Sequence, residues 1–82
     1  MGASVRMIIK AYPPGTRIKV LDGPTAIINW IGTNGFSVRY DCTYLNDHNE
    51  PKHEIYEAHS IEPLVAVPDA AMVIITQPDA AP

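Results

Sequence analysis

Basic residues are scarce in this chain, and cysteine is almost absent. Six Lys and Arg stand against nine Asp and Glu, which gives a formal net charge of -3. Nucleic-acid binders usually carry a basic face that displaces counterions from phosphates, so nucleic acid is not an expected partner. The single cysteine, Cys42, permits neither an internal disulfide nor a zinc site built on cysteine pairs. Stability must therefore come from packing or from assembly.

Long hydrophobic runs are also missing. Hydrophobic residues make up 46% of the 82 residues, yet no uninterrupted run reaches the ~18 residues of a membrane-spanning helix. The first residues, MGASVRMIIKAY, lack the apolar core and small-residue cleavage site of a secretory signal. We therefore expect one small soluble domain, with no membrane partner, in the cytoplasm or as a component of a virion.

Helical periodicity is nearly absent, whereas alternation is common. In FSVRYDCTYL, residues 36–45, apolar and polar residues alternate, which predicts a strand with one buried face. That face consists of Val38, Tyr40, Cys42 and Tyr44. Further strands are predicted at residues 16–22, 25–32 and 52–58, with turns at 12–15, 22–24, 32–35 and 46–51. A single 3₁₀ turn within 58–64 and a short closing strand at 65–67 complete the pattern.

Four segments together resemble a known fold: PGTRIKV, AIINWIG, FSVRYDCTYL and KHEIYEAHSIEPL. They look like the Src-homology-type (SH3-like) small barrel, which KOW and Tudor modules share. The resemblance covers residues 13–67 and implies an all-β fold with a five-stranded barrel. Alternation within each run predicts the following core residues: Ile18, Val20, Ile28, Val38 and Ile55. The fold alone does not define a function, because this barrel hosts binders, assembly proteins and rare enzymes.

The two ends of the chain add apolar strands outside the barrel. We therefore divide the chain into an N-terminal strand extension at 1–12, the barrel at 13–67, and a C-terminal strand with a disordered tail at 68–82. The runs at 4–12 and 70–77 either pair with each other or present edges to another chain. The expected interface residues are Ile8, Met72 and Ile74.

Cysteine and histidine do not form a recognisable reactive site in the sequence. Cys42 alternates with tyrosines on the apolar face of its strand, so we interpret it as a small buried hydrophobe rather than a nucleophile. His53 and His59 are six residues apart, about 20 Å along an extended strand, so one metal ion would need the chain to fold back between them. We predict no catalytic residue, no metal and no cofactor.

Aromatic residues provide the first candidate binding site. Resemblance to Tudor modules implies a cage for a methylated cation, to which Trp30 and Phe36 beside the 32–35 turn are placed to contribute. Core packing is the favoured interpretation of all the strand aromatics, which are Trp30, Phe36, Tyr40, Tyr44 and Tyr56. The candidate binding residues are Trp30, Phe36, Tyr56 and Glu54.

HEIYEAHSIEPL provides an enzymatic alternative. It is similar to the segment carrying the Val-Gln-Ile-Tyr motif in the plasmid-type, trimethoprim-resistant dihydrofolate reductase, a tetramer around a central pore. Ile55 and Tyr56 match that motif, whereas His53, Glu54 and Val20 depart from the family's valine, glutamine and lysine. Four glutamates in one pore would repel an anionic cofactor and substrate. We therefore predict a non-catalytic interaction or assembly module, resembling phage or mobile-element proteins, that binds a protein partner or its own copies.

Overall fold

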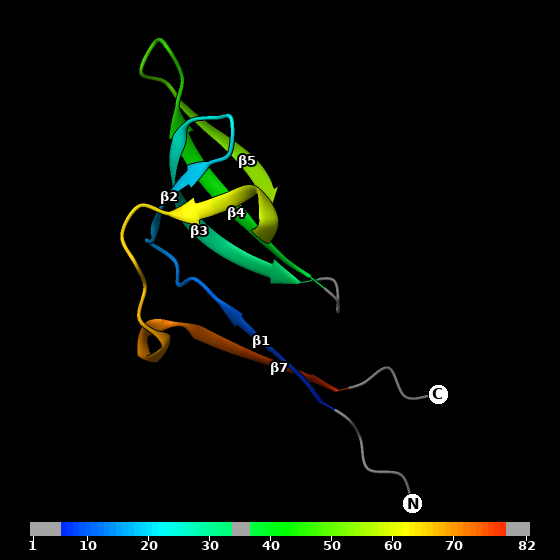
Figure 1. Ribbon diagram of the computed structural model, residues 1–82. Helices are drawn as coiled ribbons and strands as arrows, with labels where there is room; N and C mark the ends of the chain where they lie inside the picture. The colour runs from blue at the N-terminus through cyan, green and yellow to red at the C-terminus, as the bar shows by residue number, and fades with distance from the viewer. Residues whose placement is uncertain (1–5, 34–36, 79–82) are drawn as a thin grey trace, which may run out of the picture.

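The computed structural model describes residues 6–33 and 37–78, and the described chain is all-β (Figure 1). Seven strands within the described residues form two separate antiparallel sheets. Within the described ranges the only helical segments are two 3₁₀ turns, η1 (Ala58–Ser60) and η2 (Asp69–Ala71). The 3₁₀ turn predicted within 58–64 is thus confirmed. Phe36, half of the predicted 32–35 turn and all but Pro78 of the predicted PDAAP tail at 78–82 lie outside the described residues.

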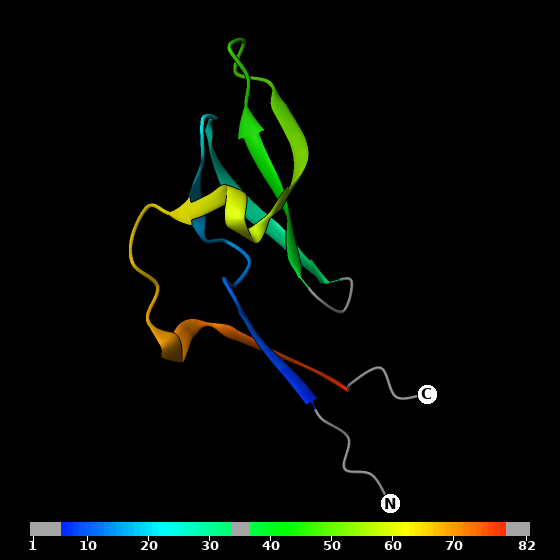
Figure 2. The ribbon, with the colours of Figure 1, turned by 45° about the vertical axis from the view of Figure 1, so that its right-hand side comes forward.

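The larger sheet has five strands in the order β5-β4-β3-β2-β6. Its strands are β2 (Arg17–Val20), β3 (Thr25–Thr33), β4 (Val38–Leu45), β5 (Pro51–Glu57) and β6 (Ile61–Pro63). Consecutive strands pair from β2 to β5, and η1 then leads the chain back so that β6 pairs with β2. Among the described strands β5 and β6 remain edges, so the sheet curves without closing into a barrel (Figure 2).

One face of this sheet, here called the inner face, carries the hydrophobic core. Four of the five predicted core residues are buried as expected, and they are Ile18, Val20, Ile28 and Val38. The fifth prediction is wrong, because Ile55 is 62% exposed. Ile55 pairs with the outward-facing Asp41, and pairing register decides which face an alternating strand presents. Alternation in 52–58 identified the strand but not its buried side.

A β-bulge in β3 explains a second correction. The register of β3 against β4 shifts between Ile28 and Trp30, so Asn29 is an extra residue in the ladder. Ala26 and Ile28 point inward before the bulge, whereas Trp30 pairs with Asp41 and points outward after it. Trp30 is 71% exposed, so its predicted core packing is wrong. The other described aromatics of these strands are buried (Tyr40) or half-buried (Tyr44 and Tyr56).

The strand that completes the larger sheet lies earlier than predicted. It spans Ile61–Pro63 rather than 65–67, and Ile61 is buried opposite Val20. Val65, in the expected strand, is 78% exposed. A hydrogen bond from the Leu64 amide to the Arg17 carbonyl is the last backbone bond before the chain leaves the sheet. Burial of Ile61 thus decides where the strand lies, although the VAV segment at 65–67 has the stronger β propensity.

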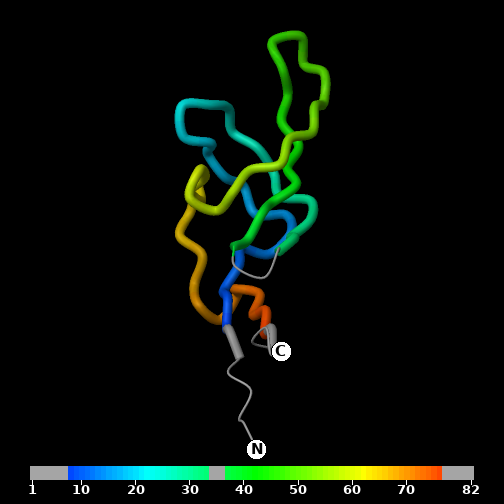
Figure 3. Tube along the Cα trace, turned by 90° about the vertical axis from the view of Figure 1, so that its right-hand side faces the viewer, coloured from blue at the N-terminus to red at the C-terminus, as the bar shows by residue number. Residues whose placement is uncertain are grey.

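The second sheet is a two-stranded ribbon of β1 (Arg6–Ala11) and β7 (Val73–Pro78). Ala11 pairs with Val73 and Lys10 with Ile74, so the predicted terminal strands pair within one chain. One side of the ribbon packs Ile9, Val73 and Ile75 partly against the core. Figure 1, Figure 2 and Figure 3 show the ribbon beyond one end of the larger sheet, opposite the β4–β5 loop.

Two tyrosines join the ribbon to the larger sheet. Ala11, the last residue of β1, is wholly buried, and the next residue, Tyr12, stacks on Tyr40 with ring centroids 5.9 Å apart. The backbone amide of Tyr12 donates a hydrogen bond of 3.0 Å to the Tyr40 hydroxyl. The chain then turns at Gly15, whose φ of +91° suits glycine. The predicted turn at 12–15 therefore leads the chain from this junction into β2.

Candidate interaction surface

The outer face of β3, β4 and β5 is unusually apolar for the solvent side of an antiparallel sheet. Such a face normally carries polar residues. Here the register places Trp30, Asp41 and Ile55 in one row across the three strands. Ile27 and Leu45 lie on the same face and are 42% and 59% exposed. We call Ile27, Trp30, Leu45 and Ile55 the outer apolar face.

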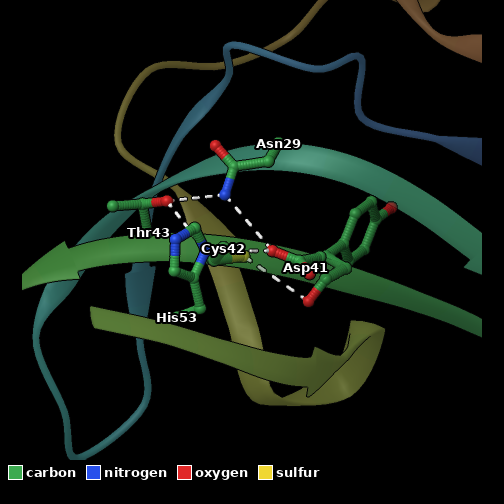
Figure 4. Close-up of polar contacts among 6 residues, drawn as sticks. Asn29, Asp41, Cys42, Thr43 and His53 are labelled. Carbon is green, nitrogen blue, oxygen red and sulfur yellow. Dashed lines mark hydrogen bonds and ion pairs between the residues drawn. The ribbon is translucent and has the colours of Figure 1, made fainter. Parts of the chain in front are cut away.

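A polar network crosses the middle of this face (Figure 4). The Asn29 side-chain amide donates to the Asp41 carboxylate at 3.2 Å and to the Thr43 hydroxyl at 2.6 Å. The His53 Nδ1 lies 3.6 Å from the same Asp41 oxygen and 3.4 Å from the Thr43 hydroxyl. The bulge brings Asn29 into this position. As the extra residue of β3, Asn29 lies between the outward-facing pairs Ile27–Thr43 and Trp30–Asp41. The network therefore fixes Asp41 beside Trp30.

A groove runs along the Trp30 end of the surface. It has a volume of about 300 Å³. Its lining consists of Trp30, Ile31, Gly32, Thr33, Arg39, Asp41 and Ile55. The Arg39 guanidinium lies 3.8 Å from the Glu57 carboxylate, which holds the cation at the groove edge. Gly32 pairs with Arg39 and adds no side chain to that row, so the groove stays open next to Trp30.

A second depression lies at the other end of the same strands. Its volume is about 500 Å³, and its apolar lining includes Ile27, Leu45 and Leu64. Leu64 is 49% exposed and follows β6, so the apolar surface continues from β3 and β4 towards the opposite edge of the sheet. Thr43 also lines this depression and belongs to the polar network. The network thus separates two apolar hollows on one face.

The structure does not bring the predicted binding residues together. Trp30 lies on the outer face, whereas Tyr56 pairs with the buried Tyr40 and Glu54 pairs with the buried Cys42. Tyr56 and Glu54 therefore belong to the inner side of β5, and a cage that combines Trp30 with Tyr56 does not form. Burial, followed by the neighbouring Glu54 carboxylate, raises the pKa of the Tyr56 hydroxyl.

Asn29 and Asp41 are site residues that the sequence did not reveal. Asp41 has the alternation of an ordinary solvent-facing residue, and Asn29 lies inside a run of apolar and aromatic residues. Only the bulge brings Trp30 to the face of the sheet that carries Asn29 and Asp41, and a bulge at that position has no signal in the sequence because no glycine marks it.

Cys42 lies in the core, as its alternation with tyrosines predicted. Its side chain is wholly buried and its Sγ lies 3.6 Å from the Tyr40 carbonyl oxygen. Burial, and secondly the neighbouring Asp41 carboxylate, raise the pKa of the thiol to about 11. Val20, aligned by the reductase resemblance with a substrate-binding lysine, is also buried. Both positions serve packing in this fold.

The three predicted interface residues lie on the ribbon or beside it. Ile8 and Ile74 are 66% and 61% exposed on the side of the ribbon that faces away from the core. Met72 precedes β7 and is half-buried. The ribbon therefore leaves an apolar row in water even though its strands pair with each other.

In the described part of the chain, His, Cys, Asp and Glu residues form no group of three or more that could hold a metal ion. In residues 6–33 and 37–78 there is likewise no helix with the length and apolar character to cross a membrane. Comparison of the chain with protein-family models, curated proteins and solved structures gave no match.

Proposed function

We propose that this chain is a non-catalytic, SH3-like small-barrel module that binds a protein partner through its outer apolar face. The strand order supports the small-barrel assignment, since a four-strand meander is followed by a 3₁₀ turn and a last strand that adds beside the first. The exposure of Trp30 is the observation that supports the binding role. A tryptophan that is 71% exposed on a sheet face leaves a large apolar area in water.

The composition of the surface matches that of binding hot spots. Trp and Arg are enriched at the residues that contribute most to protein–protein affinity, and Trp30 and Arg39 line the same groove. Exposed apolar patches with a polar surround mark interaction sites on otherwise soluble folds. Ile55 adds a second apolar side chain, 62% exposed, across Asp41 from Trp30. The expected ligand is a protein segment that places an apolar side chain in this groove.

The polar groups around Trp30 are already held in place. Asn29 and His53 orient Asp41, and Glu57 holds Arg39. Side chains that are ordered before binding lose less conformational entropy when a partner arrives. A partner therefore meets a formed acceptor, Asp41, and a formed cation, Arg39, in the lining of an apolar groove.

Capture by matched variants tests the binding surface. Tagged wild type, Trp30→Ala and Val65→Ala are each incubated with an extract of the source cells. Val65 is the control because it is an exposed aliphatic residue, 78% accessible, outside the outer apolar face. We expect the same protein to be retained by wild type and Val65→Ala and lost by Trp30→Ala. Equal capture by all three proteins, or none by the wild type, would contradict the proposal.

Tryptophan fluorescence then measures the contact directly with purified components. Trp30 is the only tryptophan of the chain, so its emission reports on one position. In the free protein we expect the red-shifted emission of an indole in water. Addition of the captured partner should shift the emission to the blue as Trp30 leaves water. A complex that forms without any change in this emission would place the contact elsewhere.

The non-catalytic part of the proposal has its own test. Purified protein should oxidise reduced nicotinamide cofactor in the presence of dihydrofolate no faster than the uncatalysed reaction. The reason is that Glu54 stands where the resembling reductase has its pore glutamine, and Val20, where it has a lysine, is buried. Turnover that disappears in Glu54→Ala would establish the reductase activity instead.

A further inference from the structure

Among the described strands, the terminal ribbon has two free edges. β1 pairs only with β7, and the described strands of the larger sheet pair only among themselves. A two-stranded ribbon is marginally stable alone, and its outer side keeps Ile8 and Ile74 in water. Unpaired edges are also templates for a further strand. The ribbon is therefore incomplete as a sheet, and the two edges differ in how readily they accept a strand.

Charge distinguishes the two edges. β1 has the sequence RMIIKA and carries Arg6 and Lys10, whereas β7 has the sequence VIITQP and carries no ionisable side chain. Natural proteins protect exposed edges with charged residues, lysine above all. If two β1 strands paired antiparallel about Ile8, Arg6 of each copy would lie opposite Lys10 of the other. Like charges directly opposite each other destabilise a strand pair. The β1 edge is thus protected, and the β7 edge is not.

β7 is self-complementary in the way that a twofold dimer requires. Antiparallel pairing about a twofold axis normal to the sheet aligns residues of one face with residues of the same face. With the axis at Ile74, Val73 of each copy lies opposite Ile75 of the other. With the axis at Ile75, Ile74 lies opposite Thr76. Either register aligns uncharged residues only, and β-branched pairs of this kind stabilise antiparallel sheets.

We propose that β7 pairs antiparallel with β7 of a second copy and forms a continuous four-stranded sheet in the order β1-β7-β7-β1. The added strand supplies partners for the free backbone groups of β7. It also joins the apolar rows of the two ribbons, because Ile8 and Ile74 lie on one face of each ribbon. This interface is separate from the outer apolar face, so each copy keeps its Trp30 groove available for a different protein.

Two matched substitutions test which edge is used. Ile74→Lys places a charge on β7, and Ile8→Lys places the same charge on β1. Both isoleucines are exposed to a similar extent, 61% and 66%, on the same side of the ribbon, so both variants should fold. Light scattering and sedimentation over a wide concentration range should show a wild-type dimer. Ile74→Lys should weaken dimerisation by at least about 100-fold, because a twofold interface contains each substitution twice.

The remaining outcomes decide the proposal as well. Ile8→Lys should stay dimeric, with at most a few-fold loss. A monomeric wild type at high micromolar concentration would overturn the proposal, and so would a dimer that both variants retain. Loss of the dimer in Ile8→Lys alone would assign the contact to β1 and overturn the proposal. Equal loss in both variants would assign the contact to the ribbon face that carries both isoleucines, and would overturn it too. Circular dichroism must confirm the wild-type strand content in each variant.

Hydrogen exchange provides a readout that belongs to strand pairing and not to general packing. In the dimer, the β7 backbone amides that point away from β1 should exchange more slowly as the protein concentration rises. Exchange of the β1 amides that point away from β7 should not change. Protection confined to β1, or absent from both edges, would contradict the model. Trp30→Ala should leave the dimer intact, which separates this test from that of the proposed partner-binding function.

Discussion

The five-stranded sheet and the terminal ribbon are made of similar residues but differ in what covers them. In the larger sheet, side chains from four neighbouring strands meet and bury Ile18, Ile28, Tyr40 and Cys42 almost completely. In the ribbon, Ile9, Val73 and Ile75 reach only partial burial, and Ile8 and Ile74 stay exposed. β-branched residues favour strands in both places. The number of covering strands, rather than strand propensity, decides how much each residue stabilises the fold.

Alanine substitutions in the two cores should have the largest effect and should separate the two regions. Ile28→Ala, at 1% exposure, is expected to lower the free energy of unfolding by about 2 to 5 kcal/mol. Ile75→Ala, half-buried in the ribbon, should cost about 1 kcal/mol, since part of its side chain is already in water. Urea unfolding of both variants provides the comparison. Equal losses would mean that the ribbon is as firmly packed as the larger sheet.

Alkaline pH should weaken the larger sheet through Cys42. The pKa of the buried thiol is raised from 9.0 to about 11, so the folded state resists losing the proton that the unfolded state releases. The stabilisation is therefore fully present below pH 9 and is lost as pH rises towards 11. It amounts to about 3 kcal/mol, since one pKa unit corresponds to about 1.4 kcal/mol. In Cys42→Ala, the free energy of unfolding should fall less steeply with pH over this window. The same pH dependence in wild type and variant would contradict this role of the thiol.

The Tyr12–Tyr40 junction offers a way to loosen the ribbon without removing it. Tyr40→Phe keeps the ring but removes the hydroxyl that accepts the Tyr12 amide, at a cost of about 1 to 2 kcal/mol. Hydrogen exchange at Tyr12 and along β1 should accelerate more than exchange in β4. Tyr44→Phe is the control, because the Tyr44 hydroxyl has no hydrogen bond within the described residues. The same acceleration in both variants would remove the special role of this junction.

The smallest effect is expected at the ion pair beside the ribbon. The Lys10 Nζ lies 3.6 Å from the Asp69 carboxylate of η2, and both side chains are largely exposed. Exposed pairs of this kind contribute less than about 1 kcal/mol. Lys10→Ala, Asp69→Ala and the double variant, compared by thermal unfolding in low and high salt, should show a small salt-dependent coupling. A coupling above 1 kcal/mol would show that charge, rather than apolar contact, holds η2 to the ribbon.

Alternation predicted most of the fold, because period two holds along β2 and β4 and along β3 up to its bulge. The buried face of β4, the turn around Gly15 and the pairing of the two ends, as one of two alternatives, could all be read from the sequence. The placement of Ile55 could not, since an alternating strand fits either face until its partner fixes the register. Closure of the larger sheet, implied by the small-barrel resemblance, is not found among the described strands.

The candidate site was harder to predict than the fold. Trp30 was recognised as a candidate binding residue, but its exposure depends on one extra residue, Asn29, that reverses the alternation of β3. Pairing across three strands makes Asp41 the neighbour of Trp30 and brings His53 to Asp41, which connects residues far apart in the chain. Such a site depends on register, and register is a property of several strands together. No single stretch of sequence contains it.

Pairing between the first and last described strands has a consequence for synthesis. The partner of Arg6 is Pro78, so among the described strands β1 is synthesised first and its partner strand, β7, last. The meander of β2 to β5 joins strands that are neighbours in sequence and can form while synthesis continues, whereas contacts between distant residues form late. A nascent chain therefore carries β1 as an unpaired arm until β7 emerges. Since the proposed dimer also requires β7, nascent chains that still lack this strand are unable to associate through it.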